Sequence, residues 1–330
     1  MKKAKPKSEV RTLQDVCLPF ERPIVELEKT IAGLKEHSKD GIDLSGEIKS
    51  VEKKLEKVQK EIFDNLSPWQ RVQVARHPLR PYTLDYIHHF VEDFVEIHGD
   101  RLFKDDKAII CGFGTIGKEK VCVIGHQKGR NTKENLLRMF GSAHPEGYRK
   151  AMRVMKMAEK FDMPIVCFVD TPGAFPGIGA EERGQAEAIA YNLREMAELQ
   201  TPVVVIVIGE GGSGGALGIG VGDRIFVMEN AYYSVISPEG CAAILWKDNA
   251  RSPEAAEALK LTGEDLLKLG LIDGVIKEPL GGAHRDFEVT ANRLKETILD
   301  AIADIKKTPK KDIPKKRYDK FRKMGIFDEK

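Results

Sequence analysis

The stretch TPVVVIVIGEGGSGG, residues 201–215, decides the fold, because an apolar run leads directly into a glycine-rich segment. A continuous apolar run of this kind is typical of a strand buried on both faces of a parallel sheet. The stretch MPIVCFVDTPGAFPGIG, residues 163–179, repeats the arrangement, and a helical segment follows each loop. Two successive units of strand, glycine loop and helix predict β-α-β geometry. Both loops then lie at the carboxyl ends of parallel strands, where such sheets bind ligands.

Flanking segments extend this α/β core. Two apolar runs flank the turn sequence GKEK within residues 107–127, which predicts a β-hairpin. Helical segments at 145–162 and 180–199 precede and follow the first apolar strand. Beyond the glycine-rich segment, the pattern predicts two short strands, a helix–turn–helix–strand ending and a last helix, at 224–229, 232–237, 252–276 and 288–305.

The N-terminal part is predicted to form a separate antiparallel helical hairpin. Residues 24–66 favour two helices, joined by the polar, glycine-containing turn at 37–46. The second helix carries an apolar seam at steps of three and four residues, formed by Ile48, Val51, Leu55, Val58 and Ile62. Prolines near residue 80 mark a boundary. We therefore expect a helical interaction region, an α/β core domain and a C-terminal helix with a basic tail, over 1–80, 81–287 and 288–330.

Composition excludes several classes of protein. The chain has 330 residues, of which 42% are hydrophobic and 32% charged, and this suits a soluble protein with a large core. No apolar run approaches the roughly 18 residues of a membrane span, and the N-terminus lacks a signal-peptide pattern. The five cysteines form no CxxC pair, which favours a reducing compartment and gives no structural zinc site. We predict a cytoplasmic protein with no metal in this chain.

Charge is unevenly distributed, although the net charge is only +2. The start, residues 1–11, and the segment KKTPKKDIPKKRYDKFRKMG at 306–325 are both strongly basic. Such ends are typically solvated and mobile, and contact with nucleic acid is the alternative interpretation.

The glycine-rich loop fits a dinucleotide-binding turn, as Gly209-x-Gly211-x-x-Gly214, and Glu229 lies where a ribose-binding acid would stand. Against this hypothesis, further glycines follow as far as Gly222, and each interior glycine weakens a helix by about 0.5–1 kcal/mol. A dinucleotide site needs a firmer helix at this point, and it leaves the first glycine loop unexplained.

The same loop fits the nucleophile elbow of a hydrolase, as Gly211-x-Ser213-x-Gly215. This hypothesis makes Ser213 the nucleophile and requires a histidine later in the chain. His284 is the one histidine that follows. A serine between glycines is also common in tight turns that carry no nucleophile.

A third hypothesis uses the backbone alone. Glycines beside a strand end let N–H groups point at a ligand without obstruction by side chains. Two such loops, at 172–174 and 211–215, would lie on adjacent strand ends, and each can donate to the same oxygen. That arrangement is an oxyanion hole, worth about 2.7–4 kcal/mol per donor. Close packing of strand and helix explains some of the glycines, but it does not explain why the loops form a pair.

The motifs that carry this pattern resemble a known superfamily. DTPGAFPG, GEGGSGG, SPEG and LTGEDLLKLGLIDGVI, which begin at residues 170, 209, 237 and 261, are similar to motifs of crotonases, which stabilise thioester enolates with two backbone N–H groups. More narrowly, RPYTLDYI, GHQKGR, HPEGYRK and YSVISPEGCAAILWKD resemble the carboxyltransferase alpha subunits of bacterial multi-subunit acetyl-CoA carboxylase. The resemblance runs from about residue 20 to 290 and leaves out the basic segment beyond 305.

The resemblance implies a fold and a reaction. The fold is a crotonase-like ββα spiral of the α/β class, here preceded by the helical hairpin. The reaction is transfer of the carboxyl group from carboxybiotin, held on a separate biotin carboxyl carrier protein, to acetyl-CoA, giving malonyl-CoA for fatty acid synthesis. ATP is used by the biotin carboxylase step of the complex. The implied partner is a zinc-ribbon beta subunit in an α2β2 heterotetramer, without which this chain is expected to be inactive.

The resemblance also assigns residues. The oxyanion hole for the biotin ureido oxygen maps onto backbone groups of both loops, namely Gly173, Ala174, Gly211, Gly212, Gly214 and Gly215. The beta subunit is implied to hold the thioester enolate. Glu210 is the one titratable side chain in the two loops. This agrees with a reaction in which decarboxylated biotin itself acts as the base.

Other polar residues give weaker signals. Lys128 and Arg130 follow a predicted strand and are candidates for binding the carboxylate of carboxybiotin or a CoA phosphate, although a solvated basic loop is the alternative. His126, on that strand, is expected to be a core residue rather than a catalyst. Glu181 and Glu182 are predicted to open a helix, where acidic side chains are favourable.

Overall fold

The computed structural model describes residue 13, residues 15–39 and residues 43–325. Two compact units are formed. The first holds the described residues up to Leu66 together with 77–79, and the second holds residues 67–76 and the described residues from Arg80 onward. The basic start at 1–11 lies outside the described residues, as does part of the predicted turn at 37–46.

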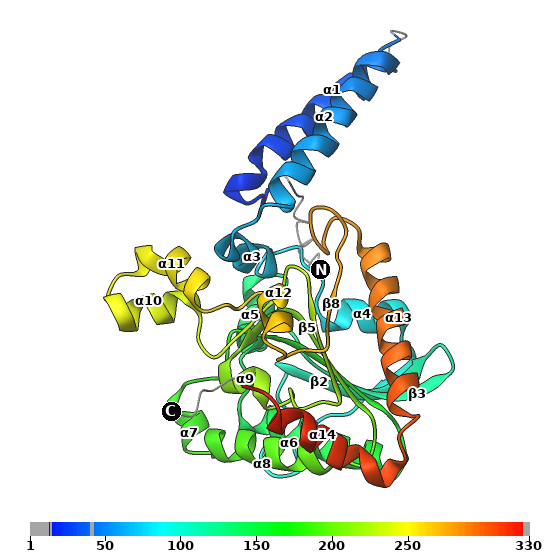
Figure 1. The fold of residues 1–330 in the computed structure, drawn as a ribbon, viewed down its shortest axis with the longest axis vertical. Helices are drawn as coiled ribbons and strands as arrows, with labels where there is room; N and C mark the ends of the chain where they lie inside the picture. The colour runs from blue at the N-terminus through cyan, green and yellow to red at the C-terminus, as the bar shows by residue number, and fades with distance from the viewer. Residues whose placement is uncertain (1–12, 14, 40–42, 326–330) are drawn as a thin grey trace, which may run out of the picture. The chain divides into compact units, whose positions relative to one another are not determined.

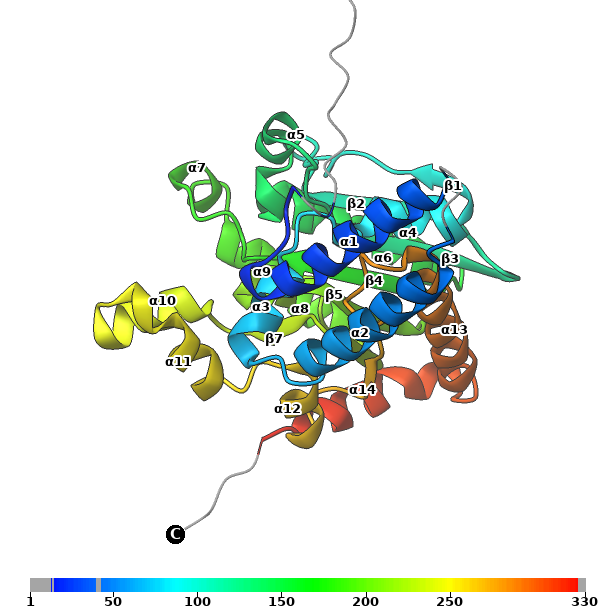
Figure 2. The same ribbon diagram turned by 90° about the horizontal axis from the view of Figure 1, so that it is seen from above.

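The first unit is a pair of helices, α1 (Arg22–Ser38) and α2 (Ser45–Phe63), which pack side by side along their length (Figures 1 and 2). The ammonium group of Lys35 on α1 lies 2.8 Å from the carboxylate of Glu52 on α2. The predicted helical hairpin is confirmed, because the seam of α2 is half-buried while the positions between its members are mostly exposed.

The second unit is built on one sheet, which has eight strands within the described residues and runs in the order β1-β2-β3-β4-β5-β6-β8. β1, β2 and β3 pair antiparallel, and from β3 onward the pairs are parallel. β7 runs parallel to the last residues of β5. The strands are β1 (Glu92–Glu96), β2 (Ile109–Ile116), β3 (Glu119–His126), β4 (Ile165–Thr171), β5 (Val203–Gly212), β6 (Arg224–Met228), β7 (Tyr232–Ser234) and β8 (Gly274–Ile276).

Helices cover both faces of the sheet. α6 (Pro145–Lys160) and α8 (Gln185–Glu198) pack together on one side, and α4 (Thr83–Phe90) and α13 (Phe287–Ile305) pack together on the other (Figure 1). Every residue of β4 and β5 is buried, as predicted for strands covered on both faces. The predicted hairpin is also confirmed, with β2 and β3 paired in continuous register around Gly117.

The predicted helix at 180–199 is two helices in the structure. α7 (Ile178–Glu181) ends, and α8 begins, around Gly184, which has a φ of +79°. Glu181 and Glu182 therefore lie at the end of α7 and do not open the longer helix as expected. Smaller elements that the sequence pattern did not predict include α3 (Pro68–Ala75), α5 (Thr132–Leu137) and α10 (Pro238–Trp246), the last packed on α11 (Ser252–Ala258).

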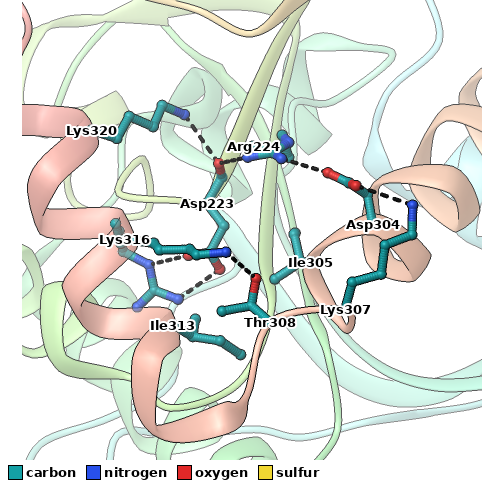
Figure 3. Close-up of a pocket in the computed structure, with 10 residues that line it drawn as sticks. Asp223, Arg224, Asp304, Ile305, Lys307, Thr308, Ile313, Lys316 and Lys320 are labelled. Carbon is teal, nitrogen blue, oxygen red and sulfur yellow. Dashed lines mark hydrogen bonds and ion pairs between the residues drawn. The ribbon is translucent and has the colours of Figure 1, made fainter.

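The expectation of a mobile basic tail is wrong for residues 306–325. A further helix, α14 (Ile313–Arg322), follows α13 and lies beside Asp223 (Figure 3). The helix is anchored by Arg317, whose side chain is fully buried. Its guanidinium group donates to both carboxylate oxygens of Asp223, at 3.0 and 2.7 Å. It also donates to three backbone carbonyls, those of Met196, Leu199 and Thr201. A buried arginine with its donors satisfied fixes this helix against the core.

None of the helices in the described part of the chain combines the length and apolar character needed to cross a bilayer. Within those same residues, no group of three or more His, Cys, Asp or Glu side chains is arranged to hold a metal ion.

Candidate active site

The two glycine loops meet at the carboxyl ends of β4 and β5. The strands are parallel neighbours, and Thr171 at the end of β4 lies opposite Gly211 of β5. A Cβ atom on Gly215 would lie 2.5 Å from the backbone nitrogen of Ala174, and one on Gly212 would overlap the carbonyl group of Pro172. Glycine is required at both positions because backbone packs directly on backbone. The prediction that the loops lie together is confirmed.

Backbone N–H groups from both loops are left without acceptors at this junction. The first-turn amides of α9 (Ser213–Leu217) have no intrahelical partner, and its N-cap, Gly212, has no side chain to offer. Within the described residues, the amide of Ala174 has no acceptor either. The amide of Gly173 differs, because it donates to the hydroxyl of Thr171 at 3.1 Å. The donors that remain open belong to one residue of the first loop and to the start of α9.

The surroundings of the open donors leave room for a ligand. A Cβ atom on Gly173 would meet nothing within 4 Å, and one on Gly214 would meet only Ile189, at 3.6 Å. Ser213 is exposed and has a left-handed backbone conformation, with a φ of +49°. This conformation turns the chain sharply from β5 into α9, so that the amides of the first turn lie beside the end of the neighbouring strand.

An ion-pair network lies directly behind the loops. The ammonium group of Lys128, two residues beyond β3, lies 2.7 Å from Asp170 Oδ1 and 2.8 Å from Glu210 Oε1. Asp170 precedes the first glycine loop and Glu210 lies inside the second. Opposite charges stabilise the charged forms, so the pKa of Lys128 is raised although burial alone would lower it.

Two further groups hold the second oxygen of Glu210. Arg76 Nε lies 2.7 Å from Glu210 Oε2, and the hydroxyl of Tyr232 donates to the same oxygen at 2.7 Å. Arg76 also pairs with Glu239, at 2.5 Å. Burial raises the pKa of Glu210, but the cations of Lys128 and Arg76 outweigh it and lower the pKa to about 2. Glu210 is therefore a permanent carboxylate and is not suited to act as an acid.

Arg130 lies in the same segment as Lys128 but in different surroundings. Its guanidinium group stacks over the ring of Tyr82, 4.0 Å from the ring centroid, and donates to the carbonyl of Arg80 at 2.9 Å. It also pairs with the carboxylate of Asp85, and its side chain keeps 39% of its surface exposed. The structure thus separates the two predicted cations: Lys128 is buried within the network, and Arg130 is at the surface.

His126 is a core residue, as expected, with no exposed surface. Burial and the nearby cation of Lys128 lower its pKa to about 3, although the carbonyls of Gly215 and Phe168 oppose the shift. The imidazole is therefore neutral at physiological pH.

The geometry does not support either competing motif. Ser213 has no hydrogen bond to a histidine within the described residues, so no nucleophile–base pair is formed. α9 has five residues, too few for the helix of a dinucleotide site. Glu229, the candidate ribose ligand, accepts from Lys277 at 2.6 Å and from the amide of Glu278. A Cβ atom on Gly209 would overlap the carboxylate of Asp170, which explains that glycine by packing.

An apolar hollow of about 230 Å³ lies beside α9. Ser213 and Leu217 line it on one side, and Phe321 and Met324, from α14 and just beyond it, line it on another. No local pattern in the sequence predicts this hollow, because the residues that line it are spread along the chain from Ser213 to Met324. Asp170 and Tyr232 were likewise missed as parts of the network; the only local signal was the position of Asp170 at the end of an apolar strand.

The chain matches a known protein family over most of its length. The family model described as "Acetyl co-enzyme A carboxylase carboxyltransferase-like" matches residues 17–325, and so includes the basic segment that the motif pattern had left out. The chain is 58% identical to the acetyl-coenzyme A carboxylase carboxyl transferase subunit alpha of Syntrophotalea carbinolica, over 94% of this chain and 99% of that protein. It is 53% identical to the protein of the same name from Thermus thermophilus, with the same coverage.

Solved structures of lower identity share the fold. The transcarboxylase 12S structure superposes with a TM-score of 0.54 at 19% identity, over 66% of this chain and 40% of that chain. The beta subunit of geranyl-CoA carboxylase from P. aeruginosa gives a TM-score of 0.54 at 17% identity, over 74% and 46%. The predicted crotonase-like fold is confirmed by these two carboxyltransferases. The match covers less than half of the length of each of those two chains.

Proposed function

The chain belongs to the family of acetyl-CoA carboxylase carboxyltransferase alpha subunits, and from this premise we propose how its two glycine loops take part in carboxyl transfer. The reaction is the transfer of a carboxyl group to acetyl-CoA, as the predicted function states. The observation that carries our proposal is the set of open backbone amides where the loops meet, from Ala174 on one side and the first turn of α9 on the other.

These amides form an oxyanion hole. Two donors that converge on one oxygen stabilise negative charge as it develops there, by about 2.7–4 kcal/mol each. Of the six residues that the motifs single out, the geometry supports the amides of Ala174, Gly214 and Gly215 as donors. The amide of Gly173 donates to Thr171, and Gly211 and Gly212 are the last residues of β5. Among the supported donors, Ala174 and Gly214 have the strongest support, since their amides are open and the space around Gly214 is free.

The family is biotin-dependent, and the fit of a biotin group can be judged from the donors present. A urea oxygen is a strong acceptor, and it suits a pair of N–H groups with no competing carboxylate between them. Carboxybiotin supplies the carboxyl group that is transferred. The task of this chain is to bind the ureido oxygen, to orient the ring and to keep the site free of titratable side chains, since Glu210 turns its carboxylate toward Lys128 and Arg76.

The remaining assignments are proposals of the same kind. We place the protein in the cytoplasm, in an α2β2 heterotetramer with a zinc-ribbon beta subunit that supplies the second oxyanion hole. A biotin carboxyl carrier protein delivers the carboxyl group, and ATP is consumed at the biotin carboxylase. Arg130 is the better candidate to bind an anionic group of a substrate, because its side chain is partly exposed. Lys128 already pairs with two carboxylates. Nothing in the described residues favours nucleic acid as a partner.

The reverse reaction tests the proposal. Malonyl-CoA and biocytin are incubated with this chain alone, with the cognate beta subunit alone and with both, and acetyl-CoA release is followed. We expect activity only in the mixture, because each chain supplies one of the two holes. Activity from this chain alone would show that one sheet carries a complete site. If a properly assembled mixture is inactive, the hydrolase hypothesis is tested next in the isolated chain. Loss of hydrolase activity in Ser213→Ala would favour that hypothesis.

A further inference from the structure

We propose that Lys128 is a positioning residue that fixes the spacing between the two glycine loops, by holding one carboxylate from each of the two strands that carry them. The inference rests on the proposed function, because it explains how the donors of the two loops come to converge. It replaces the earlier expectation that Lys128 binds substrate directly.

The geometry ties both loops to one atom. Lys128 Nζ lies 2.7 Å from Asp170 Oδ1 and 2.8 Å from Glu210 Oε1. Asp170 stands three residues before Gly173 on β4, and Glu210 stands directly before Gly211 on β5. The two strands are also joined at this level by the amide of Glu210, which donates to Asp170 Oδ1 at 2.9 Å. A shift of either strand end would therefore lengthen a contact to Lys128.

Burial makes this arrangement stiff. The side chains of Lys128, Asp170 and Glu210 keep only 11%, 3% and 8% of their surface exposed. A buried carboxylate that loses its cation is strongly destabilised, because water does not replace the partner. Without the ammonium group, the carboxylates of Asp170 and Glu210 would face each other at short range, and their repulsion would push the strand ends apart.

The stem of Lys128 is held from the side as well. Gly141, at a φ of +84°, faces it so closely that a Cβ atom there would lie 3.0 Å from Lys128 Cγ and 3.0 Å from the carbonyl of Asp170. The segment around Gly141 thus restricts the conformation of the Lys128 side chain between β3 and the loops.

The two carboxylates depend on Lys128 to different degrees. Glu210 keeps Arg76 and Tyr232 on its other oxygen if Lys128 is removed. Asp170 has Lys128 as its one ion-pair partner within the described residues. Removal of the ammonium group should therefore release mainly the end of β4 and the loop that carries Ala174, while β5 and the rest of the core stay in place.

This selectivity determines the expected kinetics. A misplacement of about 1 Å in a positioned group can lower a rate roughly 100-fold. Lys128→Met in the complete complex should lower kcat of the reverse reaction by about that factor, with little change in KM for malonyl-CoA or biocytin. Lys128→Arg, which keeps a cation between the carboxylates, should restore a large part of kcat. Lys120→Met, an exposed lysine on β3, is the matched control and should leave both constants unchanged.

Hydrogen–deuterium exchange gives a readout that does not depend on turnover. In the assembled Lys128→Met complex, exchange should rise in peptides that cover 171–176, less in those that cover 211–216, and not in β2 or α13. A rise spread over the whole core would mean that Lys128 only stabilises the fold. This measurement keeps its meaning even if the wild-type complex proves inactive, an outcome that would overturn the proposed function and not the positioning role.

Three kinetic outcomes would overturn the proposal. One is wild-type kcat in Lys128→Met; another is a raised KM at unchanged kcat, which would make Lys128 a substrate contact. A third is failure of Lys128→Arg to recover more activity than Lys128→Met. If Lys128→Met does not fold, Asp170→Asn is used in its place, since it removes the negative charge at the β4 end of the link and leaves the pair of Lys128 with Glu210. A fall in kcat at constant KM supports the proposal, and wild-type kcat overturns it.

Discussion

At the scale of single residues, the candidate site depends on positions that are occupied by glycine and so carry no side chain. Gly212 and Gly215 are glycines because another backbone occupies the place of the Cβ atom, whereas Gly214 faces an opening bounded by Ile189. The glycines of one loop therefore have two different roles, one in packing and one in access. Substitutions at the two kinds of position should fail in different ways.

Gly214→Val separates the two roles. The added Cβ atom fits beside Ile189, at 3.6 Å, so we expect folding and assembly with the partner subunit to be preserved. The branched side chain lies at the first turn of α9 and should block the approach of an oxygen to its amides, abolishing transfer. Turnover in the reverse reaction and the size of the complex by gel filtration are the measurements. Near-normal turnover would show that the donors are elsewhere.

Glu210 gives a prediction about pH. Its pKa lies at about 2 in the folded chain, below the ordinary value of 4.5. A depressed carboxyl pKa stabilises the fold at pH values above the unfolded pKa, and this contribution is lost as the pH falls toward the folded pKa. Between about pH 4.5 and pH 2, the free energy of unfolding should fall less steeply in Glu210→Gln than in the wild type. Equal slopes in urea denaturation series over this range would contradict the assignment.

At the scale of elements, the structure adds a C-terminal helix to the core. α14 carries many basic residues, yet it is not a free tail, because the side chain of Arg317 is fully buried and paired with Asp223. Lys320 of the same helix pairs with Asp273. Phe321 then reaches the apolar hollow beside α9, so this helix also completes the surroundings of the second glycine loop.

Arg317→Ala tests how α14 is held. The substitution leaves the carboxylate of Asp223 buried without its cation, and breaking such a pair typically costs about 3–5 kcal/mol. Arg322→Ala removes the same charge from an exposed position of the same helix and serves as the control. We expect a clear fall in the melting temperature for Arg317→Ala and little change for Arg322→Ala. Equal melting temperatures would show that the pair of Arg317 with Asp223 does not stabilise the fold.

At the scale of the whole molecule, the described chain offers one set of open donors and no acid or base beside it. The oxyanion hole that we propose for this sheet is one of two, and the proposal assigns the other to the partner subunit. The decisive test at this scale is therefore the reverse reaction, measured with this chain alone and in the mixture. The kinetics of the variants at Gly214 and Lys128 can be interpreted only in the assembled complex.

The sequence by itself determined the strands β4 and β5, the helices around them and the glycine loops at their ends, because these depend on local periodicity and on backbone freedom at glycine. It also determined the family, through motifs that are local in sequence. Its errors lie where a local pattern is overridden, as at Gly184, where a left-handed residue divides a helix that composition alone would continue.

Only the tertiary structure decided which charged residues meet. Lys128 pairs with Asp170 and Glu210, 42 and 82 residues away, and Arg317 pairs with Asp223, 94 residues away. Local sequence around a lysine does not distinguish a solvated loop from a buried link, because the cost of burying its charge is met by partners that the folded sheet brings to it.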